Sequence, residues 1–182
     1  MRGSIKNTHN TDKNNSYAIK PVEPFRAFVD RQIAESWAGP YIVTKGKLHD
    51  TRTHPGFVAL EDDAVAGYIL YSIMDSDCEI TVLESIHEGQ GVGRTLINAV
   101  AHVANELGCH RIWLITTNDN MRAIRFYQKF GFSLKAVHIN TMEEARKLKP
   151  HIPLIGNDGI PIAHEFEFEM NLSGGDADNE YH

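Results

Sequence analysis

Apolar and polar residues recur along the chain with two different periods, which divide it into strands and helices. Residues 25–37 and 92–107 carry apolar side chains at three- and four-residue steps, the spacing of one helical face. Residues 66–74 and 79–85 are rich in β-branched or aromatic residues, as strands are. The pattern predicts strands at residues 17–22, 41–44, 56–60, 66–74, 79–85, 111–117, 132–139 and 162–172, and helices at residues 24–37, 92–107, 121–130 and from 141 until Pro150.

The two ends of the chain lack this patterning. Residues 1–16 and 173–182 are polar and contain few apolar side chains, so they cannot offset the entropy cost of ordering. We expect two disordered tails around a single domain at residues 17–172.

Three further local patterns allow predictions about single segments. Residues 45–55 are predicted to be a loop, and its histidines, His49 and His54, are expected to face solvent. Thr141 and Glu144 have the spacing of a helix capping box. Residues 162–172 alternate aromatic residues with glutamates, which predicts a half-exposed strand.

Composition and charge restrict the functional classes. The chain has 182 residues, 42% of them hydrophobic, which suffices for one core without metal or disulfide support. A net charge of −6 argues against general binding to nucleic acid or an anionic membrane. No apolar run is long enough for a membrane span. Cys78 and Cys109 lack paired spacing, so we expect free thiols, a cytoplasmic location and no metal site.

A glycine-rich turn leads into the helix at residues 92–107. Gly89, Gly91 and Gly93 allow left-handed backbone and close approach of a ligand, and the turn lies at the positive end of the helix dipole. The pattern predicts a phosphate-binding loop. A dinucleotide fingerprint would need glycine where Arg94 stands, and a P-loop would need a Gly-Lys-Ser/Thr sequence. A module that binds ATP or a dinucleotide is therefore disfavoured, but stays open.

A second motif follows the next strand. The order of a strand, EGQGVGR, an amphipathic helix, a strand and NDNMRAIRFYQKFGF resembles the Gcn5-related N-acetyltransferase (GNAT) superfamily. The resemblance spans roughly residues 17–172. It implies an α/β (α+β) fold: a mixed, mostly antiparallel sheet with a central splayed parallel pair, flanked by helices and holding acetyl-CoA. The first motif departs from the family pattern, because Glu88 stands where Gln or Arg is usual.

The resemblance also implies which residues bind the cofactor. The backbone of Thr81, Val82 and Leu83 would pair with the pantetheine arm, and Asn120 would hydrogen-bond to the same arm. Tyr127 matches the tyrosine near the thioester sulfur. The predicted pyrophosphate loop comprises Gly89, Gln90, Gly91, Val92, Gly93 and Arg94, with Arg94 as a cation that compensates for Glu88.

The implied reaction is direct acyl transfer within a ternary complex. A neutral amine would attack the thioester, a backbone N–H near Leu83 or Glu84 would bind the oxyanion, and Tyr127 would protonate the thiolate. Glu79 and Glu84 are the candidate bases. Plain alternation directs them to opposite faces unless a bulge intervenes, and Glu84 is preferred because the sheet opens at its end of the strand.

The acceptor is less well defined by the sequence. The segments at 138–161 and 45–55 are expected to build its site, and their polar residues suit a small polar amine. Ile115 replaces the glutamate of relatives that acetylate ribosomal proteins, which disfavours a protein amine. A catalytically silent acetyl-CoA sensor or interaction module is a further alternative, favoured if Tyr127 faces the core. Whether the chain forms a homodimer is left open.

Overall fold

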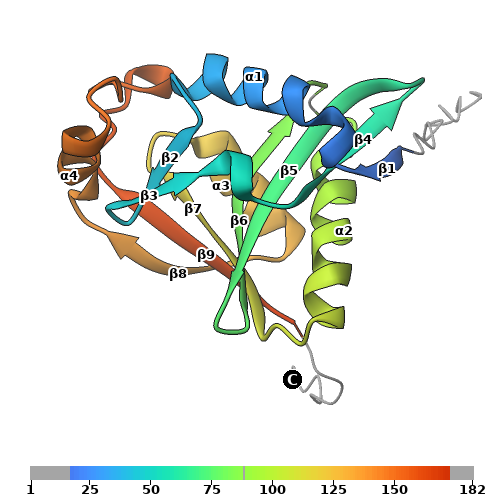
Figure 1. Cartoon of the computed structure of the whole chain (residues 1–182). Coiled ribbons are helices and arrows are strands. Elements are labelled where there is room, and N and C mark those ends of the chain that lie inside the picture. Colours follow the sequence, from blue (N-terminus) through green and yellow to red (C-terminus); the bar gives the residue numbers. More distant parts are fainter. Residues whose placement is uncertain (1–16, 88, 173–182) are drawn as a thin grey trace, which may run out of the picture.

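A single seven-stranded sheet forms the centre of the molecule (Figure 1). The structure, a computed structural model, describes residues 17–87 and 89–172. Only β6 and β7 run parallel among neighbouring strands of the described sheet, and the other pairs are antiparallel. The strands lie in the order β1 (Ala18–Pro21), β4 (Gly56–Glu61), β5 (Ala64–Met74), β6 (Asp77–Ser85), β7 (Arg111–Thr117), β9 (Glu165–Asn171) and β8 (Ser133–His138). The mixed, mostly antiparallel sheet with a parallel pair is confirmed.

The parallel pair separates partway along its length. β6 and β7 are in register only up to the pair Ile80 and Leu114, although both strands continue beyond it. At the same level β6 carries a bulge. Val82 pairs with Leu70 of β5 and Ile80 pairs with Tyr71, so Thr81 has no partner residue on β5. The two strands therefore diverge, as Figure 1 shows, and their backbone groups beyond Ile80 can pair with a ligand.

Helices cover both faces of the sheet. α2 (Val92–Glu106) buries Leu96 and Ile97 in the core of one face, where α3 (Met121–Phe130) also packs. α1 (Arg26–Trp37) follows a short 3₁₀ turn, η1 (Glu23–Phe25), and buries Val29 and Ile33 in the core of the opposite face. Leu96, Val29 and Ile33 lie on the apolar faces that the sequence periodicity predicts, whereas Leu107, at the predicted end of the second helix, is 64% exposed.

A two-stranded hairpin corrects the prediction of a loop at residues 45–55. β2 (Tyr41–Thr44) pairs with β3 (Lys47–Asp50), and the 3₁₀ turn η2 (Thr51–Thr53) follows. Lys45 and Gly46 connect the strands with φ values of 50° and 70°, as a tight hairpin turn requires. The second strand lacks β-branched residues, which is why its sequence does not indicate a strand.

The hairpin also explains why the prediction of a half-exposed final strand is wrong. Glu165 and Glu167 of β9 are only 2% and 5% exposed. Both carboxylate oxygens of Glu165 accept from the backbone N–H of Lys45 at 3.1 Å, and Lys45 Nζ lies 3.0 Å from Glu167. Alternation along one strand cannot show that another segment covers its polar side.

The remaining short elements complete the fold. α4 (Thr141–Leu148) begins after Asn140 without a side-chain cap, so the predicted capping box does not form, and Thr141 Oγ1 donates to the His138 carbonyl at 3.3 Å instead. The 3₁₀ turn η3 (Asn157–Gly159) precedes β9. Cys78 and Cys109 are buried free thiols, as expected. Among the described residues no helix is long and apolar enough to span a bilayer. The predicted tails lie outside the described residues.

Candidate functional site

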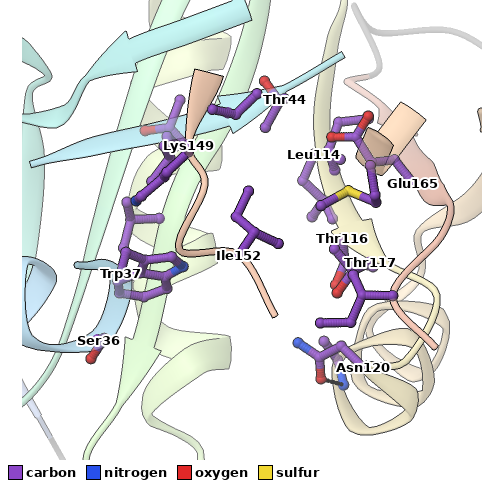
Figure 2. Close-up of a pocket in the computed structure, with 18 of the residues that line it drawn as sticks. Ser36, Trp37, Thr44, Leu114, Thr116, Thr117, Asn120, Lys149, Ile152 and Glu165 are labelled. Carbon is purple, nitrogen blue, oxygen red and sulfur yellow. Dashed lines mark hydrogen bonds between the residues drawn. The ribbon is translucent and has the colours of Figure 1, made fainter. Parts of the chain in front are cut away.

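A cleft of about 430 Å³ lies where β6 and β7 diverge. Residues 80–83 and 114–117 line it from the two strands. Figure 2 shows Trp37, Lys149 and Ile152 on one side of the space and Thr117 and Asn120 on the other. The cleft brings together five residues that the sequence places in the cofactor site: Thr81, Val82, Leu83, Asn120 and Tyr127.

Asn120 lies at the start of α3. Its side-chain oxygen accepts a hydrogen bond from the backbone N–H of Ala123 at 3.1 Å, which caps the helix and fixes the amide at the edge of the cleft (Figure 2). The NH₂ group of an amide held in this way can donate to a carbonyl oxygen of a bound ligand.

Tyr127 belongs both to the core and to the cleft. Its ring is 8% exposed, and its centroid lies 5.7 Å from that of Phe132 and 6.2 Å from that of Phe168, yet it is among the residues that line the cleft. Burial, followed by the negative charge of Glu84, raises the pKa of the Tyr127 phenol above its usual range. The phenol is therefore protonated at neutral pH.

The glycine loop has a left-handed backbone at two positions. Gly89 and Gly91 have φ values of 73° and 88°, and no described atom lies within 4 Å of the position of an added Cβ. Gly91 caps α2, and its carbonyl accepts from the N–H of Thr95 at 3.1 Å. The amides of residues 92–94 precede this first helical bond, so they are directed out of the positive end of the helix.

The other loop residues contribute in different ways. Gly93 lies within α2, and an added Cβ would stand 3.0 Å from the Phe126 ring, so this glycine serves helix packing. Val92 is buried in the core and presents only its backbone. The Arg94 guanidinium lies 4.8 Å from the centroid of the Phe130 ring. Glu88, which Arg94 was expected to compensate, lies outside the described residues.

Gly67 is a structural requirement that the sequence prediction missed. A Cβ on this β5 residue would stand 2.6 Å from the Glu84 carbonyl oxygen and 2.6 Å from Val92 Cγ1. The missing side chain therefore lets the first turn of α2 approach the sheet beside the glycine loop. An isolated glycine inside a strand pattern was the available signal.

The bulge in β6 determines on which face of the sheet Glu79 and Glu84 lie. Glu84 pairs with Tyr68 on the face of the sheet that α1 covers, and Glu79 accepts a hydrogen bond from Thr44 of the hairpin on that face, at 3.2 Å. The bulge at Thr81 thus places both carboxylates on one face, unlike the plain alternation expected. Glu79 is 8% exposed, and burial raises its pKa above the usual range. Neither carboxylate is among the residues that line the cleft described above.

The structure places His49 and His54 beside the strands of the cleft, so the expectation that they face solvent is wrong. A ring nitrogen of His49 lies 2.9 Å from Thr44 Oγ1, and one of His54 lies 2.9 Å from Thr81 Oγ1. Burial lowers the pKa of both imidazoles. They line a second cleft of about 510 Å³, which shares Thr44 with the first. The described residues contain no cluster of three or more side chains suited to a metal ion.

The turn after β7 holds one wall of the first cleft. The side-chain oxygen of Asn118 accepts from the backbone N–H groups of Ala163 and His164, each at 2.9 Å. One carboxylate oxygen of Asp119 accepts from the backbone N–H and the side-chain amide of Asn157, at 3.0 and 2.8 Å. Asn157 follows four residues after Pro153, which lines the cleft together with Ile152. Residues 142, 149 and 151–153 of the segment at 138–161 thus line the first cleft, whereas residues 45, 47–50 and 54 of the segment at 45–55 line the second. That these two segments build the acceptor site stays a prediction.

Comparisons with known proteins agree with this geometry. The model of the acetyltransferase (GNAT) family matches residues 11–132. The chain is 41% identical over 136 residues to the uncharacterized protein YdhI of Bacillus subtilis, which covers 74% of this chain and 85% of that protein. It is 36% identical over 94 residues to a streptothricin acetyltransferase of Streptomyces lavendulae, and this match covers 49% of this chain and 48% of that protein. A GNAT family acetyltransferase from Elizabethkingia anophelis with acetyl-CoA bound superposes with a TM-score of 0.62, at 17% identity, over 88% of this chain and 100% of that chain.

Proposed function

Because this chain belongs to the GNAT acetyltransferase family, we propose that it transfers an acetyl group from acetyl-CoA to the primary amine of a small polar acceptor. The main support for the proposal is that an opening in the sheet and a glycine loop lie close together along the chain. The sheet opens between β6 and β7, and the glycine loop that opens α2 follows directly after β6. A long ligand with a diphosphate and an extended arm fits such a pair of features.

The residues present fit three parts of acetyl-CoA, namely the diphosphate, the pantetheine arm and the thioester. The amides of residues 92–94 would bind the diphosphate, and the glycine backbone at 89 and 91 leaves space that a Cβ would fill. The diverging backbone at residues 81–83 and the capped amide of Asn120 would pair with the pantetheine arm. The carbonyl of the thioester would then lie in the cleft beside Tyr127.

In the proposed reaction the protein contributes mainly by positioning the amine and the thioester. The amine nitrogen forms a bond to the thioester carbon, and a backbone N–H of Leu83 or Glu84 stabilises the oxyanion. When the carbon–sulfur bond breaks, Tyr127 gives its proton to the thiolate. Burial and Glu84 raise the pKa of Tyr127, so the phenol is protonated before the thiolate forms, and after the transfer the phenolate must regain a proton from water.

Two carboxylates are candidates for the base that deprotonates the acceptor. Glu84, preferred from the sequence, is close enough to raise the pKa of Tyr127 and of Tyr68. Glu79 has the stronger structural support, because it is buried beneath the hairpin and is hydrogen-bonded to Thr44, which itself lines the cleft. A raised pKa brings a carboxylate closer to the range in which a general base is effective.

The acceptor side of the cleft favours a small amine over a protein. Trp37, Lys149 and Ile152 wall the space on one side, and the buried carboxylate of Glu165 lies on the other (Figure 2). Such a mixture of aromatic, apolar and charged groups suits a compact amine with additional polar groups. The streptothricin acetyltransferase among the relatives agrees with a small-molecule acceptor. Buried free cysteines support a reducing cytoplasmic location.

Turnover with a panel of amines tests the proposal. The full chain is incubated with acetyl-CoA and polyamines, amino sugars, streptothricin-type antibiotics and a peptide with a free N-terminus, and release of free thiol is measured. We expect turnover with at least one small amine and none with the peptide. Turnover of the peptide alone would support acetylation of a protein amine. Binding of acetyl-CoA without turnover of any amine would support a silent sensor on the same fold.

The variants E79Q and E84Q identify the base. Each substitution keeps the side-chain volume and removes the basic oxygen. We expect E79Q to lower kcat more than E84Q, with the affinity for acetyl-CoA unchanged in both. A larger loss in E84Q would assign the base to Glu84, as preferred from the sequence.

A further inference from the structure

Three glutamates alternate along β9 and therefore lie on one face of the sheet: Glu165, Glu167 and Glu169. The first two are 2% and 5% exposed, and the third is partly buried. A carboxylate that is removed from water needs a nearby positive charge or several hydrogen bonds, because burial alone disfavours its charge. The partners of the three carboxylates can therefore be compared on the same strand.

Two of the three carboxylates have basic side chains beside them. Glu167 lies 3.0 Å from Lys45 Nζ and 2.9 Å from a ring nitrogen of His138. Glu169 lies 2.8 Å from a guanidinium nitrogen of Arg111. Side chains of the protein itself thus compensate the negative charge at both positions.

Glu165 has no such compensating side chain. Its two carboxylate oxygens share one donor, the backbone N–H of Lys45, at 3.1 Å each. Among the described residues, no lysine, arginine or histidine side chain forms an ion pair with Glu165. A carboxylate can accept about four hydrogen bonds. The most buried of the three carboxylates therefore keeps unused acceptor capacity and an uncompensated charge.

Glu165 is also the one of the three glutamates that lines a described cleft. It pairs with Thr117 of β7, beyond the point at which β6 and β7 separate. Lys149 lies across the space from it (Figure 2), but its Nζ donates to the carbonyl of Tyr41 at 2.5 Å. The cation that would complete the surroundings of Glu165 is thus left to a molecule bound in the cleft.

We propose that Glu165 binds a second cationic group of the acceptor, so that the substrates are amines with at least two basic nitrogens. The inference rests on the proposed function. One nitrogen attacks the thioester as a neutral amine, whereas the other stays protonated and donates hydrogen bonds to Glu165. Glu165 takes no part in making or breaking bonds. An acceptor without the second ammonium group leaves a buried charge unpaired, so the cleft discriminates against monoamines.

Matched pairs of acceptors test this preference. Linear and cyclic diamines are compared with monoamines of the same carbon skeleton, and release of free thiol gives kcat and KM for each. We expect a higher kcat/KM for the diamines with the wild-type chain. In E165Q the remaining oxygen can still accept from the N–H of Lys45. We expect this variant to raise the KM of the preferred diamine on the order of 10- to 100-fold, with kcat retained and the kinetics of the monoamines unchanged.

E167Q is the matched control. Glu167 lies on the same face of the same strand and is similarly buried, but it is paired within the protein and lines neither described cleft. E167Q should therefore keep the preference for diamines. Denaturant unfolding without ligand should show a loss of stability for E167Q, which breaks existing ion pairs. E165Q should be as stable as the wild type or more stable, because it removes an uncompensated buried charge.

Calorimetric binding of the diamines to the CoA complex separates this inference from the proposed function. Diamine binding that is lost in E165Q would support the role of Glu165 even if the wild type acetylated no amine, and that absence of turnover would overturn the proposed function alone. Acetylation of monoamines and diamines with equal kcat/KM would overturn the inference and leave the proposed function in place. An equal rise of KM in E167Q, or a marked loss of stability in E165Q, would also overturn it.

Discussion

Removal of one oxygen atom from Tyr127 tests the reaction assigned to the cleft. In Tyr127→Phe the ring keeps its contacts with Phe132 and Phe168, so packing in the core is preserved. The variant loses only the phenolic hydroxyl that would protonate the departing thiolate. We therefore expect a loss of catalysis in a protein whose fold and cofactor site are intact.

The expected magnitude follows from the role. A positioned general acid contributes about 10²- to 10⁴-fold to the rate, or about 3–5 kcal/mol of the activation barrier. The free energy of unfolding should change by about 1 kcal/mol or less, because one hydroxyl is removed without creating a cavity in the core. The affinity for acetyl-CoA should stay within about twofold, since the phosphate and pantetheine contacts lie elsewhere.

Tyr68→Phe is the matched control. Tyr68 is also buried, its hydroxyl has no hydrogen-bond partner in the described structure, and burial with the charge of Glu84 raises its pKa as well. It does not line either described cleft. Removal of this unpaired hydroxyl should leave kcat unchanged and should be neutral or slightly stabilising.

Two measurements decide between the outcomes. Release of free thiol at saturating acceptor gives kcat, and the shift of the melting temperature with acetyl-CoA concentration gives the affinity. The assignment would be refuted if Tyr127→Phe bound acetyl-CoA far more weakly while turnover per bound cofactor stayed at the wild-type value. A comparable loss of kcat in Tyr68→Phe would show that the effect is not specific to the cleft.

Three further substitutions test residues that position the glycine loop and the wall of the cleft. Gly67→Ala would bring a Cβ within 2.6 Å of Val92, so we expect denaturant unfolding to show a loss of about 1–3 kcal/mol and binding assays to show weaker acetyl-CoA affinity. Gly91→Ala places a side chain at a φ of 88°, which should cost about 1–2 kcal/mol of stability and weaken CoA binding, and an unchanged affinity would contradict the loop assignment. Asp119→Ala releases Asn157, which lies four residues after Pro153 of the cleft wall, so steady-state kinetics should show a higher KM for the amine and an unchanged KM for acetyl-CoA.

The sequence predicts well where local signals and packing agree. The bounds of β7 and α3 match the prediction, because an apolar run and a helical face are limited by a capping asparagine, Asn120, and by Gly131. The glycine loop is also recognisable, since Gly89 and Gly91 have the left-handed backbone that their residue type suggests. Gly93 differs because its role depends on Phe126 of another helix.

What the sequence does not predict depends on contacts between distant segments. His49 and His54 line the second cleft because β2 and β3, at residues 41–50, form a hairpin beside the sheet. The same hairpin buries Glu165, which alternation alone assigns to solvent. Glu79 and Glu84 share a face because a bulge adds one residue to β6. No local pattern in the sequence specifies that bulge.

Amide hydrogen exchange of the wild-type chain with and without CoA tests the central claim most directly. The account predicts that saturating CoA slows exchange in two segments: the amides at residues 89–95 of the glycine loop and first turn of α2, and the backbone at residues 81–83 of β6. Protection of a different surface, or unchanged exchange in the glycine loop while CoA is demonstrably bound, would contradict it.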